Sequence, residues 1–99
     1  MTSVNSISHR SEEIQDLIMS DMVKDATKRL LDFVRDFAQA KTYLQQAIVI
    51  CSIHTRLEKQ VNAGMLEFDE AEGQRNKLLF QILGLLDDIQ MEYATKLAA

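Results

Sequence analysis

The segment LEKQVNAGMLEFDEAEGQRNKLLFQILGLLDDI, residues 57–89, contains a helix end, a short connection and a helix start in succession. Gly64 can end a helix because glycine adopts the left-handed backbone conformation without steric cost. Asp69 can cap the next helix, and Glu72, three residues later, can reach back toward that cap. Since the connection is short, we expect the two flanking helices to be antiparallel neighbours.

Apolar residues recur at helical spacing on both sides of this connection, which predicts two long amphipathic helices. The later helix should extend to about Lys96, and its repeating set is Ala71, Arg75, Leu78, Leu79, Ile82, Leu83, Leu86, Ile89 and Tyr93. The earlier helix should run from about Thr42 to Ala63, with Leu44, Ala47, Ile48 and Cys51 on one line and Ile50, Leu57 and Val61 on another. Gly84 weakens the later helix, and a close helix crossing would explain it.

Two more helices are predicted upstream. Asp21 can cap a helix whose apolar stripe consists of Val23, Ala26, Leu30, Phe33, Val34 and Phe37. Ser11 can cap a short first helix that ends near Ser20, with Ile14, Leu17 and Ile18 on one face. Residues 1–10, rich in Ser, Thr and Asn, are expected to form a flexible tail. Residues 38–41 hold no strong helix breaker, so the boundary there is open.

Composition supports an all-helical fold. The 99 residues include no proline and three glycines, and 46% hydrophobic with 26% charged residues is typical of a globular chain. We therefore predict an all-α bundle of four helices, the first one short, built around a central antiparallel hairpin formed by helices three and four. The expected organisation is a tail at residues 1–10 and one helical domain at residues 11–97.

Charge and cysteine content exclude several function classes. Fifteen acidic and eleven basic residues give a net charge of -4, which argues against a surface that follows nucleic-acid phosphates. The single Cys51 cannot form an internal disulfide, so a reducing cytosol is the expected compartment. We find no secretory signal and no apolar run long enough for a membrane span, and we expect no membrane partner.

The order of features in residues 57–89 resembles the bacterial effector-associated domains, class eleven. The shared features follow in chain order: Leu57 and Gly64, the apolar Met65, Leu66 and Phe68, the acidic Asp69 and Glu70, the Arg75–Asn76 pair, and the apolar run from Leu78 to Leu86 before Asp87. The segment ATKRLLDFV, residues 26–34, is similar to the family's earlier alanine-leucine helix. The resemblance covers roughly residues 20–90.

This resemblance implies a non-catalytic adaptor of bacterial conflict or antiphage systems. In such systems a copy of the domain on a sensor and a copy on an effector bind each other, which brings proteases, TIR domains or NTPases together. The implied partners are proteins that carry the same type of domain, and self-association is a further expectation. A structural or regulatory helical subunit of an enzyme complex is the alternative.

Chemistry-bearing residues are present but do not form a recognisable catalytic set. Cys51 and His54 lie three apart on one helix, as a nucleophile pair or half of a metal site would. Only His9 remains as a further soft ligand, so we expect Cys51 to pack structurally. The carboxylates of residues 67–72 fit local helix-start chemistry. No enzyme activity, metal or cofactor is expected.

Two surfaces are the predicted partner interface. The connection holds three apolar side chains that a short turn cannot all bury, although two of them are expected in the core. Residues 21–59 carry a net charge of +2 and residues 67–99 a net charge of -4, so opposite faces of two copies could meet. The alternative is that these charges form solvated helix faces. The interface candidates are Lys28, Arg29, Arg35, Met65, Leu66, Glu67, Phe68 and Glu70.

Four residues have predicted structural roles: Gly64 and Asp69 at the helix ends, and Arg75 and Asn76 after the first turn of the last helix. An inward-facing Asn76 would act as a structural lock if its amide found backbone partners. Reversal of Arg29 and Arg35 to Glu is expected to weaken partner binding without loss of helicity.

Overall fold

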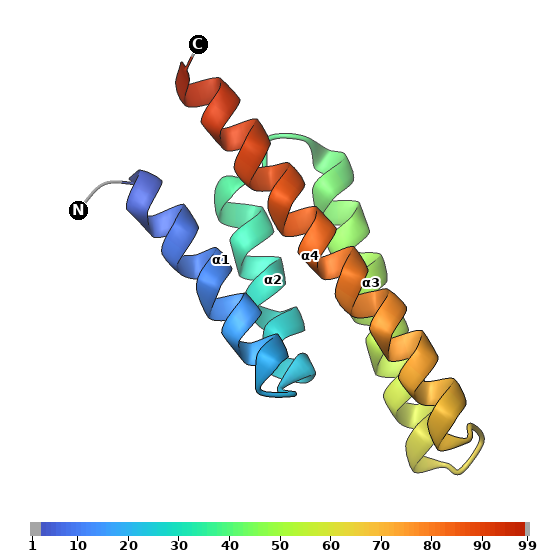
Figure 1. The fold of residues 1–99 in the computed structure, drawn as a ribbon. Coiled ribbons are helices and arrows are strands. Elements are labelled where there is room, and N and C mark those ends of the chain that lie inside the picture. Colours follow the sequence, from blue (N-terminus) through green and yellow to red (C-terminus); the bar gives the residue numbers. More distant parts are fainter. Residues whose placement is uncertain (1–2, 99) are drawn as a thin grey trace.

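The computed structural model describes residues 3–98 and contains, within that range, four α-helices and no strand. The helices are α1 (Ser3–Met19), α2 (Val23–Phe37), α3 (Lys41–Asn62) and α4 (Phe68–Ala98). They pair as two antiparallel hairpins, α1 with α2 and α3 with α4, and α2 also packs on α3 and α4 (Figure 1). The predicted all-α bundle with its antiparallel hairpin of helices three and four is confirmed.

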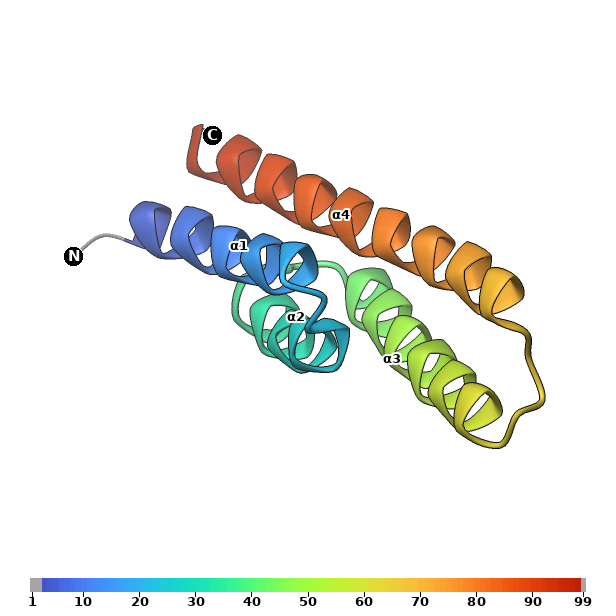
Figure 2. The ribbon, with the colours of Figure 1, turned by 60° about the horizontal axis from the view of Figure 1, so that its bottom comes forward.

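The α3–α4 hairpin is longer than the α1–α2 hairpin and extends past it. In Figure 1 the connection between α3 and α4 lies well beyond the turn between α1 and α2, and Figure 2 shows the same connection standing clear of the other helices. The molecule is correspondingly elongated, with principal extents of 50 × 25 × 17 Å. One end of the hairpin is therefore left without cover from α1 and α2.

A single apolar core joins all four helices. The stripe predicted on α2 is buried in full, with Leu30 and Phe33 completely inaccessible. These side chains meet Ile14 of α1 and Ile82 of α4 in one cluster. Burial of each large apolar side chain contributes about 1.5–3 kcal/mol, so this cluster supplies most of the stabilisation. Its other members are Ile7, Ala26, Val34, Phe37, Ala47, Ile50, Leu78, Leu85, Leu86 and Ile89.

The first helix begins earlier than predicted. It starts at Ser3, so residues 3–10 of the expected flexible tail are helical, while residues 1–2 lie outside the described residues. Ile7 is buried two helical turns before Ile14 and packs in the same core cluster, which gives this segment a reason to be ordered. Ser11 is not a cap: it is buried inside α1, donates to Gln90 Oε1 at 3.0 Å and accepts from Gln15 at 3.1 Å.

Asp21 ends α1 instead of capping α2, contrary to the prediction. Its φ angle is 60°, in the left-handed region that Asp tolerates better than most residues. The Met22 N–H donates to Leu17 O at 2.8 Å and the Asp21 N–H to Ile18 O at 3.0 Å, which is the Schellman pattern of a helix end. Met22 occupies the N-cap of α2 without a side-chain cap bond.

Gly64 ends α3 by the same pattern, as predicted. Its φ angle is 72°, and the Met65 N–H donates to Gln60 O at 2.9 Å. The start of α4 differs from the prediction because the helix begins at Phe68, so Asp69 lies in the first turn and not at the cap. Glu72 accepts from Arg75 at 2.8 Å and does not form the predicted capping box.

Three predictions within the long helices are wrong, and one of them concerns Val61, which was placed on an apolar line of α3 but is exposed. Ile48 was placed in the apolar stripe of α3 but is 51% exposed, and His54 takes a core position instead. The apolar stripe of α3 turns toward both α2 and α4, and Ile48 lies on the opposite side. Gly84 does not mark a close crossing within the bundle, since a Cβ added there meets nothing within 4 Å.

Candidate partner-binding surfaces

Residues 64–70, which we call the hairpin tip, present apolar side chains to solvent. Met65 is 72% and Phe68 is 77% exposed, while Leu66 is half-buried. The prediction that two of these three belong to the core is wrong, because neither α1 nor α2 reaches this end of the hairpin. Exposed apolar side chains that lie together at a protruding turn make it a candidate contact site for another protein.

Acidic side chains flank the apolar residues of the hairpin tip. Glu67, Asp69 and Glu70 are all exposed, and Asp69 and Glu70 lie in the first turn of α4. The N-terminal end of a helix carries a partial positive charge, so carboxylates are stable at this position. The hairpin tip therefore combines an apolar centre with a negative rim.

Three exposed basic side chains of α2 lie close to one line of the helix, beside the acidic Asp32. Lys24, Lys28 and Arg35 are exposed and spaced by four and seven residues, which places them on one line of the helix. We call these three residues the α2 ridge. Lys24 was not among the predicted interface residues, although its spacing from Lys28 was a readable signal.

Arg29, a predicted interface residue, belongs to another side of α2. Its Nε lies 3.4 Å from Glu13 Oε1 of α1. On the same side, Arg10 pairs with Asp36 and its guanidinium carbon lies 5.3 Å from the centre of the Phe37 ring. Arg29 and Asp36 thus connect α2 to α1, while the α2 ridge faces outward.

The Arg75–Asn76 pair does not enter the core. Arg75 is half-buried and donates from Nη1 to Glu72 Oε1 at 2.8 Å, one helical turn earlier. Asn76 is exposed, so its amide does not form the predicted inward lock. Arg75 instead helps to hold the first turns of α4.

Cys51 is held as a structural residue on α3. Its Sγ donates to the backbone oxygen of Thr27 on α2 at 3.5 Å. Burial raises the pKa of the Cys51 thiol, and the contact with Thr27 opposes that effect more weakly. A thiol that is harder to ionise is a poor nucleophile and a poor metal ligand.

His54 is buried, with 4% of its surface exposed. Its Nε2 lies 3.2 Å from Glu58 Oε1, within ion-pair distance, but the angle does not make a hydrogen bond. Burial lowers the pKa of His54; Glu58 opposes this shift, while Arg75 and Lys24 add to it. Cys51 and His54 thus contact different neighbours, and among residues 3–98 no three His, Cys, Asp or Glu side chains gather as a metal site would require.

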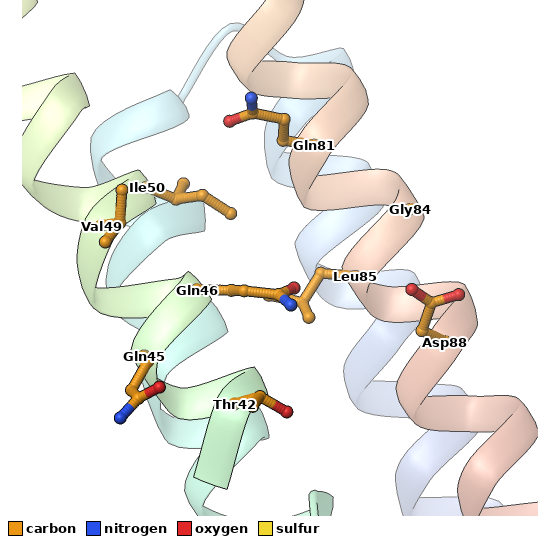
Figure 3. Close-up of a pocket in the computed structure, with 9 residues that line it drawn as sticks. All are labelled: Thr42, Gln45, Gln46, Val49, Ile50, Gln81, Gly84, Leu85 and Asp88. Carbon is orange, nitrogen blue, oxygen red and sulfur yellow. The ribbon is translucent and has the colours of Figure 1, made fainter. Parts of the chain in front are cut away.

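A groove of about 580 Å³ lies between α3 and α4 on the side away from α1 and α2. Ile50 and Leu85 are its buried lining residues. Figure 3 shows Gln46 of α3 extending toward Leu85, with Gly84 next to Leu85 on α4. The groove was not predicted, because it depends on how two helices pack.

Two exposed apolar residues of α4 were not among the predicted interface residues. Phe80 is 73% and Met91 is 69% exposed. Both lie outside the apolar stripe of α4, and a large apolar residue off the stripe of a long helix is the signal that would have revealed them.

No helix within residues 3–98 has the length and apolarity needed to cross a bilayer.

The sequence of residues 9–90 matches the protein family described as Effector-associated domain 11. No curated protein and no solved structure matches the chain significantly. The family match extends the resemblance seen at residues 20–90 toward the N-terminus, into the segment that α1 occupies. Because it spans most of the 99 residues, the chain belongs to the Effector-associated domain 11 family.

Proposed function

We propose that this chain is a non-catalytic adaptor that couples a sensor to an effector in bacterial defence or conflict signalling. It binds a same-type domain on the other protein, and the binding event brings the effector to the sensor. The family name, which describes an effector-associated domain, supports this role. The observation that carries the proposal is the hairpin tip, where Met65 and Phe68 are exposed at the end of the α3–α4 pair.

The chemistry of the hairpin tip defines the partner surface that would fit it. Burial of Met65 and Phe68 in a pocket supplies affinity, since a few desolvated apolar anchors dominate most interfaces. Glu67 and Glu70 beside them favour a pocket with a basic rim and disfavour an acidic one. A partner surface with an apolar depression between Lys or Arg side chains meets both requirements.

The α2 ridge has the complementary charge. In a same-type domain, Lys24, Lys28 and Arg35 would face the Glu67 and Glu70 carboxylates of the bound copy. A tip-to-ridge contact uses two different surfaces, so it is heterologous: one domain of the pair keeps a free ridge and the other keeps a free hairpin tip. Such an arrangement suits an adaptor, because a chain of contacts can link more than two proteins.

Removal of the apolar side chains of the hairpin tip tests the proposal. The partner to measure is a purified protein that carries an effector-associated domain and binds the parent chain, titrated by calorimetry. For the double variant Met65→Ser/Phe68→Ser we expect the dissociation constant to rise by at least about thirtyfold, as for the loss of a binding hot spot.

The control is Ile48→Ser, because Ile48 is 51% exposed on α3 and lies about four helical turns before the hairpin tip. This variant should bind as the parent does. Equal loss of binding in the control, or unchanged binding in the double variant with its helicity intact, would show that the hairpin tip is not the contact site.

A further inference from the structure

The outer face of α4 carries large apolar residues with no neighbour in the described fold. Phe80 is 73% exposed, Met91 is 69% exposed, and Gly84 lies between them at spacings of four and seven residues. These spacings put the three residues on one side of the helix, opposite the core positions Ile82 and Ile89. This face is distinct from the hairpin tip and from the α2 ridge.

Gly84 has no explanation within the bundle. Glycine in the interior of a helix is less favourable than alanine, and a Cβ at this position would meet nothing within 4 Å. A glycine is needed where another backbone approaches closely. Its place between Phe80 and Met91 makes the outer face of α4 suitable for close contact with a second helix.

The groove between α3 and α4 runs beside Gly84. Ile50 and Leu85 provide buried apolar lining, and Gly84 and Asp88 line the α4 side (Figure 3). Phe80 lies one turn before Gly84 and remains exposed, so it does not fill this groove in its own chain. The same face thus presents both an aromatic side chain and an apolar depression able to receive one.

Charge is divided along this face. Lys77 lies on its N-terminal part and Asp87 and Asp88 on its C-terminal part, all exposed. Lys77 and Asp88 are eleven residues apart, or about 16 Å along the helix, too far for a contact within one chain. Opposite charges meet between two copies only if the two helices are antiparallel, because a parallel pair would bring like charges together.

We propose that two copies of this chain associate through the outer faces of their α4 helices, antiparallel, with the helices crossing at Gly84. In this register Phe80 of each copy lies level with Asp88 of the other, where the groove between α3 and α4 receives it. Lys77 of each copy lies level with Met91 of the other, within one turn of the Asp87 and Asp88 carboxylates. The contact is two-fold symmetric, so it closes as a dimer.

The dimer would make the adaptor bivalent. Because the two α4 helices run in opposite directions, the two hairpin tips point away from each other. Two tips on one particle raise the effective affinity for a partner that is itself clustered, without any new contact. This inference goes beyond the proposed function, and the partner contact at the hairpin tip does not depend on it.

Sedimentation of the purified chain from about 1 µM to about 1 mM tests the dimer directly. The parent should show a concentration-dependent monomer–dimer equilibrium. In a chain that also carries Met65→Ser/Phe68→Ser, which removes tip-to-ridge contacts between copies, Gly84→Leu should be monomeric. It should resist thermal unfolding at least as well as the same chain with Gly84, since the added side chain meets no atom within the monomer and leucine favours helix. Phe80→Gln should raise the dimer dissociation constant by at least about tenfold.

Gly73→Leu is the matched control, because Gly73 also lies in α4 with nothing within 4 Å of an added Cβ but is eleven residues from the crossing. It should dimerise as the parent does. Lys77→Asp and Asp88→Lys should each weaken the dimer, and the doubly substituted chain should recover the parent dissociation constant within about threefold.

A parent chain that stays monomeric to about 1 mM would overturn the proposal. So would a dimer that Gly84→Leu and Phe80→Gln leave unchanged. Failure of the doubly substituted chain to recover would overturn the antiparallel register. None of these results alters the expected effect of Met65→Ser/Phe68→Ser on partner binding, so the two proposals fail separately.

Discussion

At the scale of single residues, each of the two helical hairpins contains one residue with a left-handed backbone conformation at the end of its first helix. Asp21 ends α1 and Gly64 ends α3, each followed by an N–H that bonds back to a carbonyl five residues earlier. The hydrogen bonds are the same, but glycine adopts this conformation freely whereas aspartate does not. The turn between α1 and α2 therefore holds a small strain that the turn between α3 and α4 lacks.

Substitution at these positions should change stability in opposite directions. Asp21→Gly should raise the free energy of unfolding by about 0.5 kcal/mol. Removal of the backbone strain stabilises the folded chain, and the greater freedom of glycine in the unfolded chain offsets part of this gain. Gly64→Ala should lower it by about 1 kcal/mol, because the methyl group disfavours the left-handed backbone. Urea unfolding followed by circular dichroism measures both, and equal effects of the two substitutions would refute the assignment of strain.

His54 is expected to make the fold sensitive to mild acid. Burial lowers its pKa in the folded chain below the ordinary value of 6.5, so the unfolded chain binds the proton more readily. The free energy of unfolding therefore has its full value above pH 6.5. It decreases as the pH drops below 6.5 toward the lower pKa of His54 in the folded state.

The pH dependence can be assigned by substitution. In the parent, the free energy of unfolding should decrease between about pH 7.5 and about pH 5.5. In His54→Leu this decrease should be smaller. His9→Gln serves as the control, because His9 is exposed on α1. If His54→Leu retains the full pH dependence of the parent, another group is responsible.

At the scale of elements, long-range contacts set the helix boundaries. The link between α2 and α3 is held by Gln39, whose N–H donates to Glu92 Oε1 at 2.9 Å and whose Oε1 accepts from Lys96 at 2.9 Å. Both partners lie on α4, more than fifty residues along the chain. α1 similarly depends on Ile7 and Ser11, which contact the core and Gln90.

Truncation of Ile7 tests whether residues 3–10 belong to the fold. Ile7→Ala should lower the free energy of unfolding by about 2 kcal/mol, because the side chain is 4% exposed and its removal leaves a cavity against the core. Ser8→Ala, at an exposed neighbouring position, should change it by less than about 0.5 kcal/mol. A flexible tail would give no loss for either variant.

Periodicity and one glycine were enough to predict four helices and the α3–α4 hairpin, because these features depend on neighbouring residues. The α2 stripe is buried as predicted, and Gly64 ends α3 as predicted. The starts of α1, α2 and α4 were wrong, since Ser11, Asp21 and Asp69 suit several local roles and tertiary packing selects among them. The sequence predicted that one of Met65, Leu66 and Phe68 would be exposed, but not that both Met65 and Phe68 are, because this depends on where α1 and α2 end.

At the scale of the whole molecule, unequal hairpins separate the core from the proposed contact surfaces. The shorter α1–α2 hairpin covers part of the longer one and completes the core, while the uncovered end presents Met65 and Phe68. The acidic rim of the hairpin tip and the basic α2 ridge belong to different helices, which would let one domain both give and receive the same kind of contact. Stability and partner binding are thus expected to respond to different substitutions.

The most direct test of this account is calorimetric titration of the Lys28→Glu/Arg35→Glu variant with a same-type domain that binds the parent. If the α2 ridge receives the acidic hairpin tip, the dissociation constant should rise by at least about tenfold while helicity is unchanged. Lys41→Glu/Arg56→Glu, an equal change of charge at exposed positions of α3, should bind as the parent does. Binding of the ridge variant as tight as that of the parent would contradict the account.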